Sequence, residues 1–407
     1  MGKIAIIGGG AAGFFAAIKA KETSPQNDVI ILEKSSKVLS KVKVSGGGRC
    51  NVTNACADIN ELSSHYPRGE RFLKKAFHQF KTTDTIQWFE ERGVPLKVYP
   101  DNCIFPVAND SQVIIDCFMQ QVSKLGIEIC YSSGIDTIQP IEGKFQLVGS
   151  NVNLLVDKII ITIGGQPKRS GLNWLGDLGL NLIEPVPSLF TFNLPEDPIR
   201  DLMGTVVEEA TVKIEGTKLI GKGPLLITHW GMSGPAVLQL SAWGARILQD
   251  KNYECTALVN WLNETKPDEL TNIIANAKER NAEKKVLNAN PFPLTNRLWK
   301  HLLEKIGFHE ELRWKELGPK QQNRLINVLL NDAYRVKGKT TFKEEFVTAG
   351  GIDLAEINVN TMESKRIKGV YFAGEVMDID GITGGFNFQA AWTTGFIAGK
   401  NAGTSVN

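Results

Sequence analysis

The chain has 407 residues, of which 42% are hydrophobic and 22% charged, a composition typical of folded globular proteins and unlike that of disordered chains. Its 46 Lys and Arg residues nearly balance its 44 Asp and Glu residues, so the formal net charge is +2 and no overall field favours nucleic acid or an anionic membrane. No run approaches the roughly 18 apolar residues that a membrane-spanning helix needs.

The length predicts two or three domains, and the cysteines indicate the compartment. Six cysteines show no C-x-x-C pair and no zinc-like spacing, a pattern typical of a reducing compartment and not of a disulfide framework. The histidines also lack the spacing of metal ligands. We therefore expect a cytoplasmic protein without a metal site and without a membrane partner.

The beginning of the chain carries the pattern of a nucleotide-binding βαβ unit. Lys3–Ile7 is a β-branched apolar run that predicts a buried parallel strand, and it leads directly into G-x-G-x-x-G at Gly8, Gly10 and Gly13. The first glycine permits a tight turn, the second lets backbone approach a pyrophosphate, and the third lets the next helix pack closely. That helix is expected over 11–21, with its positive end at the phosphates.

A second strand and an acidic residue complete this unit. Residues 28–32 predict the strand, and Glu33 follows it, 20 residues after Gly13. An acid at this separation accepts hydrogen bonds from the ribose hydroxyls of a bound dinucleotide. The order of strand, glycines, helix, strand and acid therefore predicts a dinucleotide site.

Two later segments favour FAD over NAD as the dinucleotide. Lys158–Ile163 predicts a strand that returns to the nucleotide at Gly164, and Gly369–Glu375 predicts another that ends in a glycine and an acid. A second glycine-rich crossing from strand to helix suits a long flavin dinucleotide that lies across the sheet. The helix is expected from about Gly385 to Ala398, with its positive end toward the flavin pyrimidine edge, where negative charge collects on reduction.

The segment Lys41–Asn54 is a further glycine-rich feature. Three successive glycines, Gly46–Gly48, permit close backbone approach, and successive N–H groups can form an anion-binding nest. Arg49 suits a phosphate, with which a guanidinium forms two parallel hydrogen bonds. We therefore expect this segment to contact the cofactor.

Together with the opening fingerprint, this segment and the closing pattern of Gly374–Ala391 resemble the BaiN/YhiN-like flavoproteins, a family that includes aminoacetone oxidase. Thr228–Pro235 and Thr348–Ile352 match the same family, so the likeness spans nearly the whole chain. Two departures are conservative in shape. Ser45 replaces a threonine of many relatives, and Phe386 replaces a tyrosine and so removes a hydroxyl.

The resemblance implies an α/β fold with a Rossmann-type FAD-binding domain split across both termini, an inserted β-rich domain and a small helical domain. We place the FAD-binding domain at 1–187 plus 340–407. The β-rich domain is placed at 188–260 plus about 334–342, and the helical domain at 261–333.

Local sequence signals agree with these boundaries. Pro185–Pro187 marks an exit from the first domain, and 205–227 contains strand-like runs. From 267 to 334 the pattern becomes helical, with an apolar stripe that Gly307 ends. The stripe consists of Leu298, Trp299, Leu302, Leu303 and Ile306.

The expected cofactor contacts combine the glycine loops, the acids that follow the strands, and residues that the resemblance adds. They are Gly8, Gly10, Ala12, Gly13, Glu33, Lys34, Lys41, Gly46, Gly47, Gly48, Arg49, Asn51, Ile135, Thr162, Gly164, Gly374, Glu375, Asp378, Gly384, Gly385, Phe386, Asn387, Gln389 and Ala390. The expected catalytic residues are His229, whose imidazole suits proton donation, and Arg49.

Cys50 and Cys56 raise the alternative of a redox-active dithiol. Flavin disulfide reductases separate such cysteines by four residues, whereas five intervene here, and on a helix one extra residue turns the second thiol by about 100°. A dithiol mechanism is therefore a minor alternative.

The leading interpretation is an FAD-dependent oxidoreductase that transfers hydride through flavin N5 to or from a small unsaturated or amine-bearing molecule. A second strand, G-x-G-x-x-G and helix for NADPH is absent from the middle of the sequence. NADH or NADPH would therefore bind transiently near the flavin, or the substrate itself would supply the electrons. A non-catalytic, redox-sensing flavoprotein is one alternative.

Another alternative is reduction of the uracil C5=C6 bond in RNA, an activity that the resemblance also implies. Cations and aromatic residues alternate in the helical segment, as they often do in RNA-binding surfaces. These residues are Arg297, Trp299, Lys300, Arg313, Trp314 and Lys315.

Overall fold

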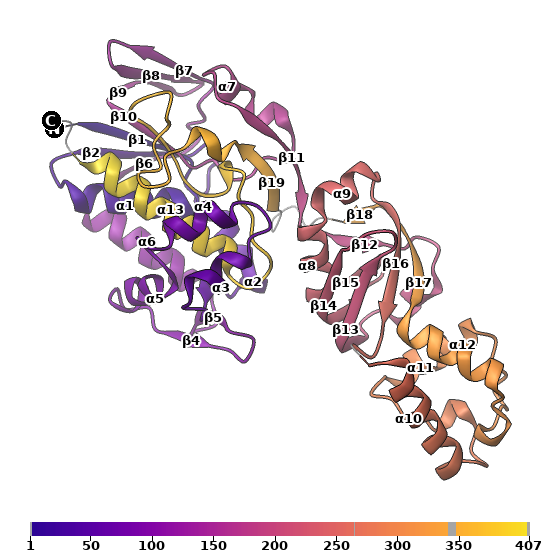
Figure 1. The fold of residues 1–407 in the computed structure, drawn as a ribbon. Coiled ribbons are helices and arrows are strands. Elements are labelled where there is room, and N and C mark those ends of the chain that lie inside the picture. The colour runs from indigo at the N-terminus through magenta and orange to yellow at the C-terminus, as the bar shows by residue number, and fades with distance from the viewer. Residues whose placement is uncertain (1, 264, 341–346, 405–407) are drawn as a thin grey trace. The chain divides into compact units, whose positions relative to one another are not determined.

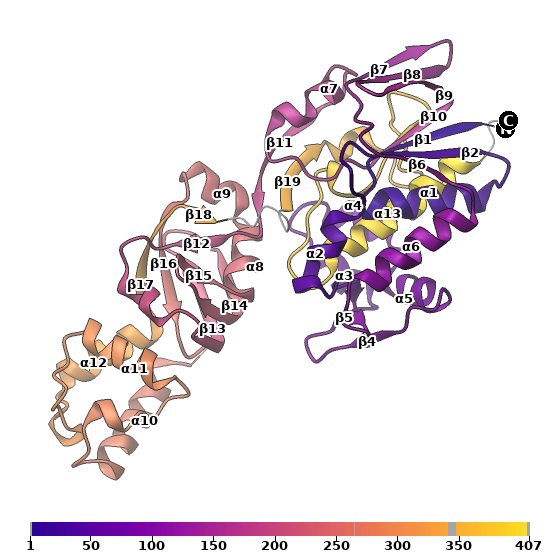
Figure 2. The ribbon, with the colours of Figure 1, turned by 180° about the vertical axis from the view of Figure 1, so that it is seen from behind.

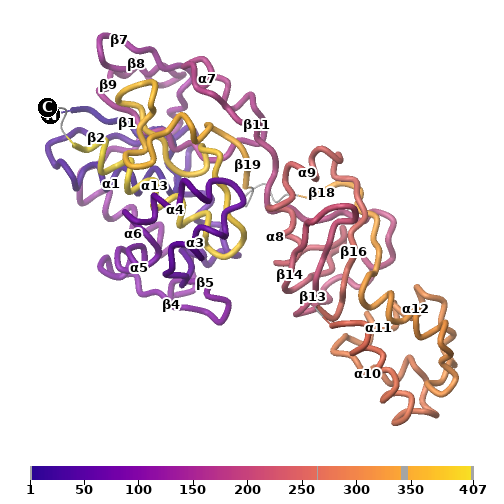
Figure 3. Tube along the Cα trace, viewed as in Figure 1, coloured from indigo at the N-terminus to yellow at the C-terminus, as the bar shows by residue number. Residues whose placement is uncertain are grey.

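The computed structural model divides the chain into two compact units. The residues that it describes are 2–263, 265–340 and 347–404. The first unit comprises Met1–Ser188 and Phe342–Asn407, and the second comprises Leu189–Thr341. The first unit therefore combines segments from both ends of the chain, which Figures 1 and 3 show as indigo-to-magenta and yellow stretches folded together.

The first unit is built on a five-stranded parallel sheet. In spatial order its strands are β20 (Val370–Phe372), β10 (Lys158–Ile161), β1 (Lys3–Ile7), β2 (Asp28–Leu32) and β6 (Glu128–Cys130). β1 and β2 have the predicted bounds, because β-branched apolar runs suit strands whose two faces are both covered. Ile6, Ile31 and Ile160 are accordingly fully buried.

β10 ends earlier than predicted, at Ile161 instead of Ile163. Thr162 turns the chain toward the loop after β1, because its backbone N–H donates to the carbonyl of Ile7 and its hydroxyl donates to the carbonyl of Gly8, both at 2.8 Å. The glycine loops after the two strands are therefore held side by side.

The segment after β20 also differs from its prediction. The strand does not continue to Glu375, because Gly374–Val376 forms a 3-10 turn, η6. Gly374 has a φ of 76°, which a strand residue does not adopt. The acid after β20 thus lies on a turn.

Helix α13 (Phe386–Gly403) runs beside α1 (Ala11–Thr23) (Figure 1). It ends at Gly403 and not near Ala398, because its glycines serve close packing. Cβ atoms added to Gly395, Gly399 and Gly403 would lie 2.7, 2.3 and 2.7 Å from backbone carbonyl oxygens of α1. This glycine seam holds α13 against α1, and so it fixes the loops that precede both helices.

Further helices and short strands surround these layers. They are α2 (Ser40–Gly48), α3 (Ile59–Ser64), α4 (Glu70–Ala76), α5 (Thr82–Glu90), α6 (Gln112–Lys124), α7 (Asn173–Gly176), β3 (Thr53–Asn54), β4 (Leu96–Val98), β5 (Cys103–Pro106), β7 (Thr137–Ile141), β8 (Lys144–Gly149), β9 (Val152–Val156), β11 (Leu182–Ser188) and β19 (Val347–Ile352). β3–β5 and β7–β9 form two antiparallel sheets, and β11 pairs with β19.

Two prolines lie inside β11 and not in a loop that leaves the unit. The pairing of β11 with β19 shifts register between Ile183 and Val186, next to Pro185. Proline is tolerated there because the two-stranded sheet has open edges and an irregular register. Pro187 also belongs to the strand, and the chain leaves the first unit after Ser188.

The second unit contains a seven-stranded sheet and five helices among its described residues. The strands in spatial order are β17 (Asp332–Lys337), β16 (Glu254–Asn260), β13 (Val206–Ile214), β14 (Ile220–Ile227), β15 (Gly231–Ser233), β12 (Thr191–Asn193) and β18 (Lys339–Thr340). The helices are α8 (Pro235–Trp243), α9 (Ala245–Asp250), α10 (Pro267–Arg280), α11 (Asn296–Lys305) and α12 (Pro319–Leu330). Figure 2 shows α10–α12 gathered at one end of the sheet.

One hydrophobic core joins the sheet to α10–α12. It includes Val212 and Val259 from the strands together with Leu298 and Leu325 from the helices. Because the apolar faces of both parts meet in this core, the β-rich and helical parts form one compact unit.

The predicted helical stripe faces this core. Leu298 and Trp299 are fully buried in α11, and Gly307 follows the helix with a φ of 72°. The helical part is shorter than expected, since α12 ends at Leu330 and Tyr334 already lies in β17.

Candidate membrane-spanning helices and metal-binding clusters are both absent from residues 2–263, 265–340 and 347–404. No helix there is both long and apolar enough to cross a membrane. The same stretches hold no group of three or more His, Cys, Asp or Glu side chains that could bind a metal ion.

Candidate functional site

The loop between β1 and α1 contains glycines with different structural causes. A Cβ on Gly8 would lie 2.5 Å from the carbonyl oxygen of Thr162, and one on Gly13 would lie 2.0 Å from that of Gly8. These two glycines are required by packing inside the protein. A Cβ on Gly10 would have no described atom within 4 Å, and the φ of this residue is an ordinary −93°. Neither packing nor backbone strain explains a glycine at position 10.

Glu33 lies beside this loop at the end of β2. Its Oε2 accepts a hydrogen bond from the N–H of Gly9 at 2.8 Å, and its Oε1 accepts one from the N–H of Ser35 at 2.8 Å. Lys34 follows and is exposed, and Ile135 is half-buried. The predicted acid therefore reaches the glycine loop, as a group that binds ribose near a pyrophosphate must.

The segment after β2 is a broken helix with three left-handed glycines. α2 is interrupted at Ser45, which is extended, and Gly46–Gly48 have φ values of 57°, 67° and 86°. Arg49 is exposed and lies over the ring of Phe105 at 4.4 Å. The guanidinium thus stays at the surface next to the glycines.

Residues from α2, from β19 and from the loop after β10 meet at Glu375. Its Oε2 accepts from Lys41 Nζ at 2.8 Å, and its Oε1 accepts from the backbone N–H of Thr348 at 2.8 Å. A Cβ on Gly165 would lie 2.4 Å from the same Oε1. Gly164 has a φ of 71°. Lys41, Gly164 and Glu375, all predicted cofactor contacts, are therefore neighbours in the first unit.

The loop before α13 is held from within by its own motif. Gly384 and Gly385 have φ values of 125° and 88°, and a Cβ on Gly385 would lie 2.5 Å from the carbonyl oxygen of Thr53. Asn387 accepts from the N–H of Gly381 and donates to its carbonyl, both at 2.9 Å. The Asn387 side chain therefore shapes the loop.

Gln389 is fully buried on the interior side of α13. Its Oε1 accepts from the hydroxyls of Thr53 at 2.6 Å and Thr85 at 2.9 Å, and its Nε2 donates to Thr393 at 3.0 Å. Ala390 is also buried. Because the protein itself uses both ends of the amide, Gln389 positions α13 and does not line an open site.

Asp378 lies on the loop before α13, and Asn51 lies just after α2. Each is held by a hydrogen bond that involves the backbone. The N–H of Asp378 donates to the carbonyl of Ile352 at 3.0 Å, and Asn51 Oδ1 accepts from the N–H of Ile104 at 3.3 Å. Both residues are half-buried. Their backbone positions are thereby fixed next to the predicted cofactor loops.

His65 and Tyr66 pack on the loop before α13, a contact that the sequence did not predict. His65 stacks on Phe386, with ring centroids 4.3 Å apart and ring planes inclined by 11°. The hydroxyl of Tyr66 donates to the carbonyl of Phe386 at 2.7 Å. The sequence offers no local signal for this contact, because residues 65 and 386 are far apart along the chain.

A buried ion pair belongs to the same contact. Arg68 pairs with Asp380, whose carboxylate also accepts from the hydroxyl of Ser188 at 2.6 Å. Burial raises the pKa of Asp380, while Arg68 and Ser188 act in the opposite direction. The pair ties the loop before α13 to the end of β11.

His229 lies in the second unit, in the turn between β14 and β15. Its side chain is exposed and meets the ring of Trp230 nearly at right angles, with centroids 4.3 Å apart. Its carbonyl accepts from Arg200 Nε at 2.8 Å. The residues that converge in the first unit therefore do not include this histidine.

Cys50 and Cys56 are both free, buried thiols. Burial raises the pKa of Cys50 to about 12 and that of Cys56 to about 11. Because the thiolate is the reactive form of cysteine, these environments disfavour a dithiol mechanism.

The alternating cations and aromatic residues of the helical segment do not form the predicted RNA-binding surface. Trp299 and Trp314 are fully buried, and their indole N–H groups donate to the carbonyls of Val286 and Ala289 at 3.0 and 3.2 Å. Rings that are enclosed and hydrogen-bonded in this way cannot stack on bases. The helical spacing placed these rings in the core and not at an RNA surface.

The cations of that segment are occupied as well. Arg313 and Lys315 pair with Glu283 at 3.0 and 2.8 Å, and Arg297 donates to a backbone carbonyl. Lys300 lies 3.6 Å from Glu304 and 3.4 Å from Glu310.

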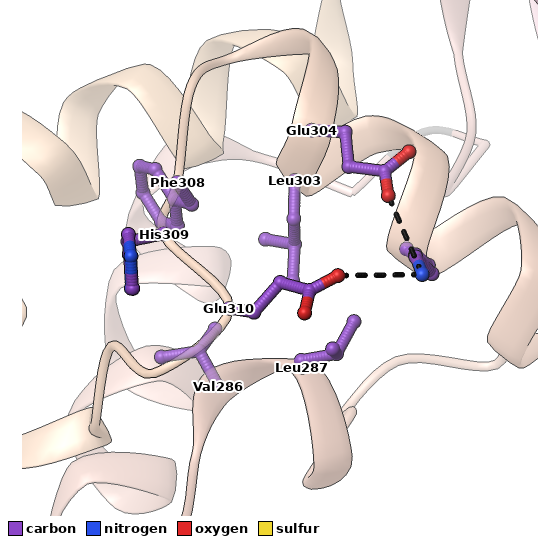
Figure 4. A pocket seen from close by; sticks show the side chains of 8 residues that line it. Val286, Leu287, Leu303, Glu304, Phe308, His309 and Glu310 are labelled. Atoms are coloured by element: carbon purple, nitrogen blue, oxygen red, sulfur yellow. Dashed lines mark ion pairs between the residues drawn. The ribbon is translucent and has the colours of Figure 1, made fainter.

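Figure 4 shows these two ion pairs beside a small pocket. Its lining is Val286, Leu287, Lys300, Leu303, Glu304, Phe308, His309 and Glu310.

The fold and the converging strand ends define a class of protein. A parallel sheet with glycine loops after β1, β10 and β20, an acid after β2, and a helix beginning at each end of the site is the architecture of a Rossmann-type FAD-dependent oxidoreductase. The family model described as HI0933-like protein Rossmann domain matches residues 2–401. The chain therefore belongs to the HI0933-like family, which confirms the predicted BaiN/YhiN-like resemblance, the fold class and the flavoenzyme class.

Two relatives match nearly end to end. The 3-dehydro-bile acid delta(4,6)-reductase of Clostridium scindens is 26% identical over 412 residues, with 99% of each chain covered. The ribosomal RNA dihydrouridine synthase of Escherichia coli is 28% identical over 412 residues, with 97% of this chain and 96% of the relative covered.

Solved structures share the fold at low sequence identity. The 3-ketosteroid delta1-dehydrogenase of Sterolibacterium denitrificans is 12% identical with a TM-score of 0.51, covering 99% of this chain and 100% of the other. An Escherichia coli quinol fumarate reductase chain is 15% identical with a TM-score of 0.51, covering 99% and 70%.

Proposed function

We propose that the first unit binds FAD across the ends of its parallel strands. The observation that carries this proposal is Gly10, where open space replaces a side chain for no reason internal to the protein. The pyrophosphate lies against this backbone and the N-terminus of α1, with the ribose at Glu33. Gly46–Gly48 and Gly164 follow the middle of the cofactor, and the flavin lies at the loop before α13.

The side chains at this site divide into two groups in the proposal. Lys41 and Arg49 offer positive charge to the pyrophosphate, and Glu375 offers its carboxylate to hydroxyl groups of the cofactor. Asn387 and Gln389 act from behind, by holding the loop before α13 and the helix itself. The remaining predicted contacts bind through their backbone or by shape.

We further propose that the protein reduces a ring carbon–carbon double bond in a small unsaturated molecule. FAD supplies hydride transfer in this chemistry. The names of both relatives describe reduction of ring double bonds, in a bile acid and in a uridine. His229 is the proposed proton donor of the second unit, because its side chain is exposed and an imidazole offers both a donor and an acceptor nitrogen.

NADH or NADPH is the proposed reductant, and it would bind only transiently. An anaerobic visible spectrum of the FAD-loaded protein tests this point. Bleaching of the flavin within seconds of adding NADH or NADPH, followed by recovery on addition of an unsaturated acceptor, is the expected result. A flavin that neither nicotinamide bleaches would instead indicate that the substrate supplies the electrons.

Uridine in RNA is a second candidate substrate, now supported by a different surface. Arg49 lies over Phe105 at 4.4 Å, Tyr99 meets Phe105 edge-on at 5.2 Å, and Lys97 lies over Tyr99 at 5.4 Å. Lys97 is exposed and Tyr99 half-exposed. Phe105 is buried, so Tyr99 is the ring that a base could reach, and a cation beside such a ring suits a single-stranded nucleic acid.

Binding of ribosomal RNA by the purified protein at several salt concentrations tests this candidate. Lys97→Glu is expected to weaken binding severalfold and to lower its salt dependence, because one phosphate contact is lost. The control is Lys315→Glu, whose native side chain pairs with Glu283. Equal effects of the two substitutions would argue against this surface and in favour of a small-molecule substrate.

We also propose a cytoplasmic location. The six free thiols support it, because disulfides form and persist in oxidising compartments and are rare in the cytosol. Fractionation of the producing cells tests the proposal directly.

A further inference from the structure

His65 is an ionisable group beside the proposed flavin site that the proposed function does not use. Its ring stacks on Phe386, the first residue of α13. Its carbonyl accepts from the N–H of Ile382 at 3.0 Å. Two segments that are far apart in the sequence are thereby fixed against each other, and the imidazole lies next to the positive end of α13.

The hydrogen bonding of His65 leaves one ring nitrogen available. Nδ1 lies 2.8 Å from the carbonyl oxygen of Glu61. Since a carbonyl can only accept, Nδ1 carries a proton. Nε2 has no hydrogen-bond partner among the described residues, and the side chain is half-exposed. The ring can therefore gain a second proton from water at Nε2 without breaking its existing contacts.

Acidic residues lie on both segments that hold this imidazole. Glu61 lies on α3 and Asp58 caps its N-terminus, while Asp378 and Asp380 lie on the loop before α13. Asp380 is neutralised by Arg68. The positive end of α13 disfavours an imidazolium, whereas a new negative charge at that end favours it. Reduction of a flavin places such a charge there.

We propose that His65 takes up a proton when the bound flavin is reduced and releases it when the flavin is oxidised. This inference rests on the proposed FAD site. A dihydronicotinamide donates one hydride to the flavin, which leaves one negative charge, and His65 binds one proton from water. On reoxidation the hydride passes to one carbon of the double bond. The second carbon takes its proton from the proposed donor, and His65 returns its own proton from Nε2 to water, so that the substrate gains two hydrogens in total.

The midpoint potential of the bound flavin, measured between pH 5.5 and 8.5, tests the proposal in the FAD-loaded chain. One extra proton taken up by a two-electron couple adds about 30 mV per pH unit to its slope. Over part of this pH range, the midpoint potential of the wild type should change with pH more steeply than that of His65→Asn, by about 30 mV per pH unit. The asparagine amide can still donate to the carbonyl of Glu61, but it does not titrate. Parallel lines for the two proteins would overturn the proposal.

The control is His78→Asn, because His78 is an exposed histidine just beyond α4 in the same unit. It should keep the wild-type slope. Wild-type protein that binds no FAD would contradict the proposed function itself, whereas bound FAD with parallel slopes contradicts only the proton uptake.

A measurement without substitution covers the case in which His65→Asn does not fold. The five histidines are followed by NMR against pH in oxidised and reduced protein. One imidazole should titrate at a higher pH after reduction. Five unchanged titrations would overturn the proposal.

Discussion

The loops at the strand ends of the first unit have an interior face and an open face. Glycines on the interior face allow close packing, whereas Gly10 on the open face leaves empty space. Cβ atoms on Gly13 and Gly385 would collide with backbone, at 2.0 and 2.5 Å, whereas one on Gly10 would enter open space. The interior glycines are needed by the fold, whereas Gly10 is proposed to leave room for the cofactor. Substitutions on the two faces should therefore separate stability from cofactor binding.

The largest effect is expected on the interior face, for Gly13→Ala. The added methyl group would overlap the carbonyl of Gly8, and neither backbone segment can move without separating α1 from β1. We expect a loss of about 3 kcal/mol in the free energy of unfolding, as for severe overpacking. Urea unfolding of the FAD-free protein measures it, and a loss below about 1 kcal/mol would contradict this account of the loop.

A second interior substitution, Gln389→Leu, should cost nearly as much. It leaves the buried hydroxyl of Thr53 without its acceptor and leaves that of Thr85 with only the longer bond to the carbonyl of Lys81, at 3.3 Å. Unsatisfied buried groups of this kind cost about 1–3 kcal/mol, so we expect a loss of about 2 kcal/mol in urea unfolding. Gln87→Leu, at an exposed site on α5, is the matched control and should change stability little.

On the open face, Gly10→Ala should leave the stability of the FAD-free protein unchanged within about 0.5 kcal/mol. Its affinity for FAD should fall at least tenfold, about 1.4 kcal/mol, because a methyl group occupies the space against the pyrophosphate. Fluorescence titration of the FAD-free protein with FAD measures the dissociation constant. Unchanged affinity would remove the main support for the proposed site.

The smallest effect concerns pH and the interior thiol of Cys50. Its pKa is raised from 9.0 to about 12 in the folded protein, so above pH 9 the unfolded chain releases a proton that the folded chain retains. Stability should therefore fall as pH rises above 9, by about 1 kcal/mol per pH unit from this group. Urea unfolding at pH 8, 9 and 10 should show a shallower decline for Cys50→Ala than for the wild type.

Local patterns predicted the first part of the fold well. Lys3–Ile7 and Asp28–Leu32 have the predicted bounds, because a strand buried on both faces is recorded in its own residues. The glycine spacing and Glu33 also predicted which loop and acid would meet. The family motifs identified the class of cofactor by the same local means.

The errors concern contacts between distant segments. Gly399 and Gly403 extend α13 because they face α1, and Trp299 is buried in the core that joins the helices to the sheet. The stacking of His65 on Phe386 was not predicted, because the two residues lie more than 300 positions apart in the sequence. Periodicity shows that a face is apolar, but it does not show which segment will cover that face.

The glycine seam between α1 and α13 has a consequence for the order of events during synthesis. The ribosome makes β1 and α1 before the whole second unit, and α13 after it. Because α13 supplies the helix that packs on α1 through Gly395, Gly399 and Gly403, the first unit cannot close until α13 has been made. The second unit has its own hydrophobic core and is free to fold earlier. The proposed cofactor can bind only after α13 has packed on α1.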